Sequence, residues 1–196
     1  MKYRIPVKDE LSRAERRRRI IKWLLLILTL IMLYVIMRAG IFDAWQPVFI
    51  IPLAVAAAMH ESELSSCVFA LFCGYFIDIA SDFVFGFSAV WLMGVSLLAS
   101  LFVRNLIRVN MFNFCVLSLI AILIEFSMDY LFNVFIWNVP GGSVILTASI
   151  IPTAVSTFIV SPLMYLWVGF IEERLGSQEN IEYYENSDDK EQSEQN

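Results

Sequence analysis

Four consecutive arginines, Arg16 to Arg19, run directly into an apolar stretch from Ile20 to Met37. A helix needs about 20 apolar residues to cross a bilayer core, and Lys and Arg collect on the cytoplasmic side of such helices. A cleaved secretory signal would have a shorter apolar core and a small-residue cleavage site, which is not found in the sequence that follows Met37. The junction therefore predicts a retained membrane anchor that begins on the cytoplasmic side.

Five further apolar stretches follow the first one, and 59% of all residues are hydrophobic. Backbone groups inside lipid must bond to one another, which helices achieve within a single segment. We therefore predict an all-α polytopic membrane helix bundle with about six transmembrane helices. The second stretch is short and carries Pro47 and Pro52, so we expect it to be broken, tilted or partly re-entrant. The six segments are Ile20 to Met37, Gln46 to Met59, Glu63 to Ala80, Ser88 to Val103, Met111 to Trp137 and Val144 to Ile171.

The charged residues divide the chain into a basic cytoplasmic arm (1–19), a six-helix transmembrane domain (20–175) and an acidic tail (176–196) that we expect to be disordered and cytoplasmic. Six crossings place both ends of the chain on the cytoplasmic side and leave Arg38 as the only outward basic residue. Five crossings would instead send Arg104 and Arg108 outward. The arginines of the arm, Arg16, Arg17, Arg18 and Arg19, are expected to attract anionic lipid headgroups.

Acidic residues inside the apolar segments are costly, so they are candidates for function. Glu125 and Asp129 lie one turn apart on the fifth segment. Three roles remain open for the acids, namely interhelical hydrogen bonding, contact with a partner or oligomer, and transport of protons or solutes. On the third segment small and acidic residues share one face, at which a second helix can approach closely. These residues are Ser66, Ala70, Gly74, Asp78 and Asp82.

Gly74 lies between Ala70 and Asp78 on that face, and the expected role of Gly74 is close helix packing and not catalysis. A leucine at this position is expected to hold two helices apart. An alanine is expected to be far milder.

Signatures of enzymes, metal centres and cofactor sites are not found in the sequence. His60 is the only histidine, and with Glu61 and Glu63 it is typical of a solvated turn. The basic arm has no interleaved aromatic residues, so nucleic-acid binding is not expected. The acids after Ile171 are interpreted as the end of the last helix. The three cysteines, Cys67, Cys73 and Cys115, are expected to pack as small hydrophobic side chains.

The run from Gly74 to Ile79, which has Asp78 four residues after Gly74, is followed by Gly86 before the next span. This block resembles the central part of the rod shape-determining protein MreD family of the bacterial cell membrane. The resemblance implies a multi-pass, non-enzymatic component of the elongation machinery that scaffolds side-wall peptidoglycan synthesis. The implied partners are an MreC-like protein, MreB and the peptidoglycan-synthesising enzymes, and a small-molecule ligand or cofactor is not expected. We expect Asp78 to help present the third and fourth helices to such a partner, whereas Asp82 and Glu125 have no counterpart in the family pattern.

A second family of similar size and topology is the six-helix S-component of energy-coupling-factor vitamin transporters, whose general fold the MreD family is thought to share. This alternative predicts a protein that binds a small solute near the outer face. Its cavity would be lined by Trp45, Trp91, Asp78 and Asp129.

Overall fold

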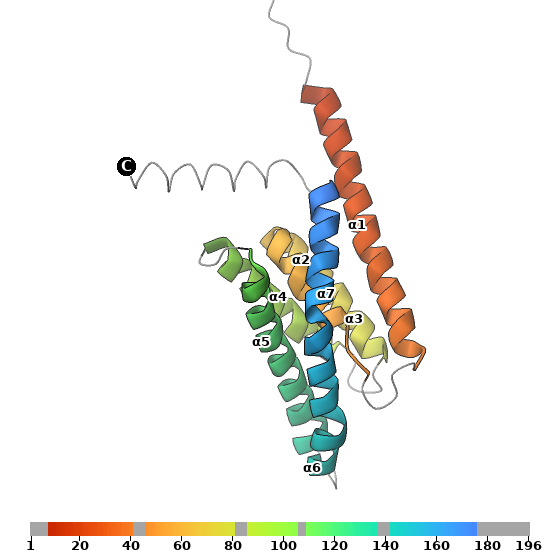
Figure 1. Cartoon of the computed structure of the whole chain (residues 1–196), viewed down its shortest axis with the longest axis vertical. Helices are drawn as coiled ribbons and strands as arrows, with labels where there is room; N and C mark the ends of the chain where they lie inside the picture. Colours follow the sequence, from red (N-terminus) through yellow and green to blue (C-terminus); the bar gives the residue numbers. More distant parts are fainter. Residues whose placement is uncertain (1–7, 41–45, 81–85, 106–108, 137–141, 176–196) are drawn as a thin grey trace, which may run out of the picture. The chain divides into compact units, whose positions relative to one another are not determined.

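The described part of this computed structural model comprises residues 8–40, 46–80, 86–105, 109–136 and 142–175, and its regular structure is entirely helical. Figure 1 shows the helices in chain order. They are α1 (Lys8–Arg38), α2 (Ile50–His60), α3 (Glu63–Ala80), α4 (Phe87–Asn105), α5 (Met111–Tyr130), η2 (Leu131–Phe135), α6 (Gly142–Ile145), η3 (Leu146–Ile150) and α7 (Ile151–Leu175).

Five helical stretches within the described residues are long and apolar enough to cross a membrane. They are Arg16–Arg38, Glu63–Ala80, Phe87–Arg104, Met111–Tyr130 and Leu146–Leu175, and α2 is a shorter apolar helix. The prediction of an all-helical membrane protein is therefore confirmed. Five of the about six expected spans are therefore found, and the second expected segment contains α2, which is shorter than a membrane-crossing helix.

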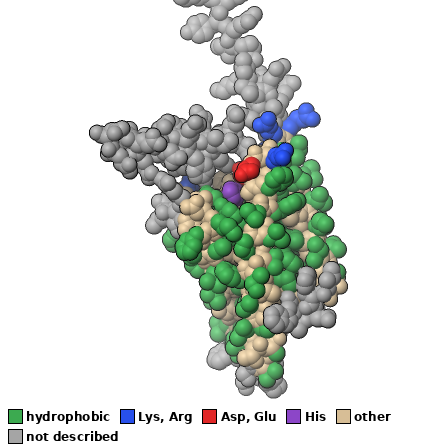
Figure 2. Space-filling view, viewed as in Figure 1, with side chains coloured by type: hydrophobic (Ala, Val, Ile, Leu, Met, Phe, Trp, Pro, Cys, Tyr) green, Lys and Arg blue, Asp and Glu red, His purple; other side chains and the backbone are tan. Residues whose placement is uncertain are grey.

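The distribution of side chains is that of a protein surrounded by lipid. Large apolar residues are exposed, such as Leu64 (79%), Phe112 (77%) and Ile159 (69%). Hydrophobic side chains cover most of the described surface of the face in Figure 2. Contiguous apolar surface of this extent is rare on soluble monomers, and water is not the solvent that this surface fits. The buried polar residues include Ser66, Ser96, Ser118, Thr157 and Ser161.

Helix α2 occupies the protein interior. Every residue from Ile50 to Met59 is buried, and α2 packs against α3, α4 and α5. Its eleven residues correspond to about 16 Å of helix, roughly half of a bilayer core. A short helix with extended residues at its ends is tolerated at membrane depth when protein surrounds it. The Val48 N–H before α2 donates to Thr157 Oγ1 at 2.9 Å, so the backbone ahead of the helix is bonded to α7.

Three of the predicted segments differ from the helices that form there. Helix α1 begins at Lys8, so the part of the predicted arm after residue 7 continues directly into the first span. The predicted fifth and sixth segments each contain a π-helical stretch, η2 after α5 and η3 before α7. The wider turn of a π-helix admits one extra residue within an otherwise regular helix. The predicted acidic tail lies outside the described residues.

The chain forms two compact units. One unit contains residues 1–28 and 170–196, and the other contains residues 29–169. Helices α1 and α7 contribute to both units. The predicted acids and small residues of the third to fifth segments all belong to the second unit.

Candidate functional site

Gly74 brings the backbones of α3 and α4 into direct contact. A Cβ atom at this position would lie 2.3 Å from Ala89 Cα, 2.6 Å from Ala89 N and 2.6 Å from the Ser88 carbonyl oxygen. All three atoms belong to the backbone of α4, so no side chain can rotate away to make room. The expectation that Gly74→Ala is mild is therefore wrong, because one methyl group already requires the helices to separate.

Asp78 lies one turn after Gly74 and caps the beginning of α4. The Ser88 N–H donates to Asp78 Oδ1 at 3.0 Å, and the Ala89 N–H donates to Oδ2 at 3.3 Å. N–H groups in the first turn of a helix have no partner within that helix, and a carboxylate there also interacts favourably with the helix dipole. Asp78 is buried, with 4% of its surface exposed. Both of its oxygens are therefore used to hold one helix against another.

Gly86 sets the backbone direction immediately before α4. Its φ angle is 88°, in the left-handed region that favours glycine. A Cβ at Gly86 would meet nothing within 4 Å, so the requirement for glycine is conformational and not steric. Gly74, Asp78 and Gly86 thus contribute to one structural unit, the junction of α3 with the first turn of α4.

Two acids from α5 extend this junction. The Glu125 side chain hydrogen-bonds to the Ser88 side chain, and Asp78 and Asp129 interact with Glu125 electrostatically. Glu125 is buried, and its Oε2 atom has no hydrogen-bond partner, whereas Asp129 is half-buried. Among the described residues, no group of three or more His, Cys, Asp or Glu side chains could hold a metal ion. The acids on α3 and α5, which the sequence placed on separate helices, are thus brought together around Ser88.

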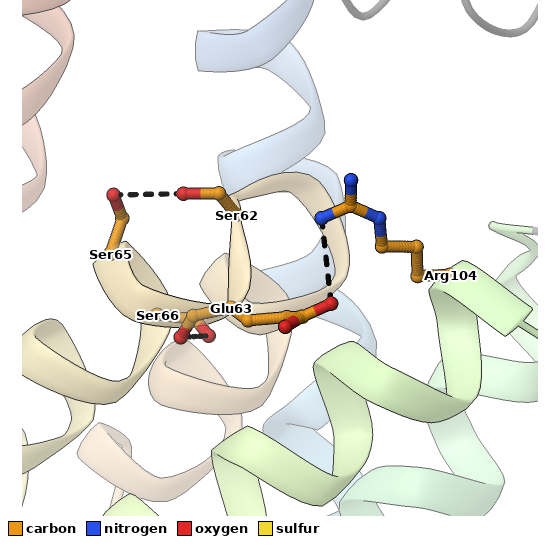
Figure 3. A network of polar contacts seen from close by, with 5 residues as sticks. All are labelled: Ser62, Glu63, Ser65, Ser66 and Arg104. Carbon is orange, nitrogen blue, oxygen red and sulfur yellow. Dashed lines mark hydrogen bonds and ion pairs between the residues drawn. The ribbon is translucent and has the colours of Figure 1, made fainter.

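The opposite end of the α3–α4 pair carries a polar network that is at least partly exposed apart from the buried Ser66 (Figure 3). The Arg104 guanidinium lies 3.4 Å from Glu63 Oε1. The Ser66 hydroxyl donates to the Glu63 carbonyl oxygen at 2.9 Å, and the hydroxyls of Ser62 and Ser65 lie 3.0 Å apart. The ion pair is largely exposed, so water competes for both charges.

The remaining predicted residues have separate surroundings. Ala70 is buried on the same face of α3 as Gly74, whereas Asp82 and Trp45 lie outside the described residues. Trp91 is half-buried and packs edge-on against Phe87, with ring centroids 6.3 Å apart. The His60 ring lies 6.1 Å from the Tyr165 ring. The three cysteines are free, with Cys73 buried and the other two half-buried.

One contact of interest was missed in the sequence. Lys22 Nζ lies 2.6 Å from Glu172 Oε2, and the exposed fractions of the two side chains are 7% and 16%. In the sequence, Lys22 is one basic residue among many near the N-terminus, and Glu172 is typical of a helix end. The pair could have been predicted, because charges inside a membrane are normally paired. The sequence has a lysine inside the first apolar stretch and an acid at the end of the last one. In the same unit Arg174 lies over the Phe170 ring, 5.1 Å from its centroid, and Arg16 to Arg19 are all exposed.

Comparison of the chain with protein-family models, with curated proteins and with solved structures found no match.

Proposed function

We propose that this protein is a non-enzymatic membrane scaffold of the bacterial elongation machinery, similar to the MreD family, and that it binds an MreC-like protein through its membrane helices. MreB and peptidoglycan-synthesising enzymes would assemble with it directly or through that partner. The observation that carries the proposal is the pair of hydrogen bonds that Asp78 accepts from α4. Both of its carboxylate oxygens accept backbone N–H groups of α4, so this acid builds a helix pair.

The three residues on which the family resemblance rests have structural explanations. Gly74 permits the close approach of α3 and α4, Asp78 caps α4, and Gly86 supplies the backbone conformation before it. A block whose residues fix a helix pair suits a protein that acts by presenting helices to a neighbour in the bilayer. Asp78 is too buried to touch a partner itself, so its effect on a partner is exerted through the position of α4.

The exposed side of α4 is the proposed contact surface. Val90 is 63% exposed and Leu98 is 54% exposed, so this helix presents apolar side chains to its surroundings. Helices in lipid associate mainly by van der Waals packing between complementary shapes. The rigid junction with α3 keeps the shape of this surface constant, which a docking surface requires.

The proposed topology places both ends of the chain in the cytoplasm of a bacterial cell. Lys22 near the start of the first span contacts Glu172 near the end of the last span, which supports a common side for the two ends. An even number of crossings follows, and α2 with the residues before it then supplies the sixth crossing. The cytoplasmic side is assigned because basic residues collect there. In a cysteine-free background, labelling from outside the cell at a cysteine introduced at position 106 would contradict this topology.

A substrate-binding S-component remains the alternative function. It requires acids that face a solute, whereas the oxygens of Asp78 accept hydrogen bonds from α4. Saturable binding of riboflavin, thiamine or biotin to the purified protein would favour the transporter, particularly if Asp129→Asn abolished it.

The direct test is co-purification with the MreC-like protein encoded in the same genome. Val90→Trp adds bulk on the proposed surface of α4, and Ile159→Trp adds the same bulk at an exposed position of α7. We expect Val90→Trp to reduce the captured partner strongly while Ile159→Trp leaves it unchanged, with both variants folded at wild-type yield. Equal capture by both variants would remove α4 from the interface. No capture by the wild-type protein would reject the proposed partner.

A further inference from the structure

The contact between Lys22 and Glu172 fixes where the chain leaves the last helix. Their charged atoms are 2.6 Å apart, and both residues belong to the unit formed by residues 1–28 and 170–196. Helix α7 ends at Leu175, less than one turn after Glu172. The C-terminal end of α7 therefore lies beside α1, close to the residues that precede Lys22.

Those residues are the basic cluster, Arg16 to Arg19, and all four side chains are exposed. Arg16 is six residues before Lys22, which corresponds to about 9 Å along a helix. Consecutive residues of a helix point in directions about 100° apart, so the cluster presents positive charge around most of the circumference of α1. This is the strongest concentration of positive charge in the sequence.

Residues 176–196 carry the opposite charge. They contain seven acidic residues and one lysine. Six of the acids occur at every third position from Glu179 to Glu194, so negative charge is spread along the whole segment. Glu179 is four residues after Leu175, and a chain of that length reaches at most about 14 Å. The first acid can therefore reach the basic cluster, and the others follow it.

We propose that residues 177–196, the acidic tail, bind the basic cluster on α1 and compete there with anionic lipid headgroups. Each exposed ion pair alone is weak. Tethering compensates for this weakness, because a short linker holds the tail near the cluster at an effective concentration in the millimolar range. Occupation of the cluster by the tail would make the attraction of this end of the protein to anionic lipids depend on ionic strength and on lipid charge. The inference does not depend on the proposed scaffold function.

The test measures the distance between the tail and the arm in the full chain. The three native cysteines are replaced by serine or alanine, nitroxide labels are placed at Ser12→Cys and Ser187→Cys, and the protein is reconstituted in phosphatidylcholine nanodiscs. Double electron–electron resonance then gives the distribution of separations. We expect a short-distance population that falls about threefold when salt is raised from about 0.05 M to about 0.5 M, because the screening length then drops well below 10 Å.

Two variants separate charge from other causes. Replacing the seven tail acids with their amides is expected to remove the short-distance population without altering the membrane helices. Replacing Arg16, Arg17 and Arg18 with lysine retains the positive charge and is expected to preserve that population. An identical distance distribution in the amide variant and the wild-type chain would overturn the proposal.

Changing the lipid composition tests whether anionic lipid competes with the acidic tail for the basic cluster. Adding phosphatidylglycerol to the nanodiscs is expected to reduce the short-distance population progressively, because lipid phosphates then compete with the tail. A chain that shows only long separations in phosphatidylcholine, at low salt, would mean that the cluster binds lipid alone. That result would also overturn the proposal, whereas capture of the MreC-like protein would be unaffected by it.

Discussion

The two ends of the α3–α4 pair are held by different kinds of polar contact. At one end, Asp78 is buried and accepts two backbone N–H groups of α4, with Gly74 against the same turn. At the other end, Glu63 and Arg104 form an exposed ion pair at 3.4 Å. The first end has no alternative partners in water, because its donors lie at a buried helix terminus. At the second end, water can hydrate Glu63 and Arg104 whenever the ion pair is broken.

Burial, and not formal charge, therefore determines how strongly each of these polar contacts holds the two helices together. An unsatisfied donor inside the protein loses its full hydrogen-bonding energy, whereas an exposed ion pair is replaced by water at little cost. Variants at each end should therefore differ several-fold in their effect on stability.

The largest effect is expected at the buried end. Asp78→Leu removes the acceptor of two N–H groups and should reduce the free energy of unfolding by about 3 kcal/mol. Asp78→Asn keeps one acceptor oxygen but directs an amide N–H towards the second donor, so we expect roughly half of that loss. The measurement is reversible unfolding in mixed SDS and detergent micelles. Wild-type stability of Asp78→Leu would mean that the cap contributes nothing to the fold.

The second prediction concerns the close approach of the two helices. Gly74→Ala places a methyl group against backbone atoms of α4 and should cost about 2 kcal/mol, with partial separation of the helices. Gly94→Ala is the matched control on α4, because a Cβ there meets nothing within 4 Å. We expect the control to be neutral or slightly stabilising, since alanine favours helix more than glycine. Equal losses for the two variants would show that helix propensity, and not the contact with Ala89, determines the result.

A third prediction extends the comparison to a buried ion pair. Lys22→Met leaves Glu172 without its 2.6 Å partner and should cost about 2 kcal/mol, less than a fully buried pair because Glu172 is partly exposed. Replacing both residues with methionine should recover most of that loss, because no charge is then left unpaired. Thermal stability of the two variants in detergent is the measurement. A double variant no more stable than the single one would mean that the methionine at position 22 itself disrupts packing.

The sequence predicted the helices well because lipid imposes one local rule on every segment. The third predicted segment, Glu63 to Ala80, coincides with α3, and the face carrying Ala70, Gly74 and Asp78 is buried. The π-helical stretches were not predicted, because a wider helical turn does not change the hydropathy of the residues that form it. The hydrogen bonds from α4 to Asp78 were also not predicted, since Asp78 was expected to help present the third and fourth helices to a partner protein. The contact requires α4 to begin beside the C-terminal end of α3, and hydropathy does not specify how two helices are placed relative to each other.

Contacts between residues that are far apart in the sequence were also not predicted. Lys22 and Glu172 are separated by 150 residues, and nothing local at either position identifies the other. The sequence indicated part of the acidic cluster, because the spacing of Glu125 and Asp129 places them on one face of a helix. Their convergence with Asp78 around Ser88 required the packing of α4 against both α3 and α5.

The smallest effect is expected at the exposed end, and it tests the comparison most directly. Arg104→Gln and Glu63→Gln each remove one charge of a pair that is already in contact with solvent, so each should change the free energy of unfolding by less than about 1 kcal/mol. Raising the salt concentration should reduce even this difference, whereas the effect of Asp78→Leu should hardly change, because buried contacts are poorly screened. Both measurements use the same micelle titration. A loss at Arg104 as large as that at Asp78, and insensitive to salt, would mean that the ion pair contributes as much to holding α3 and α4 together as the buried cap.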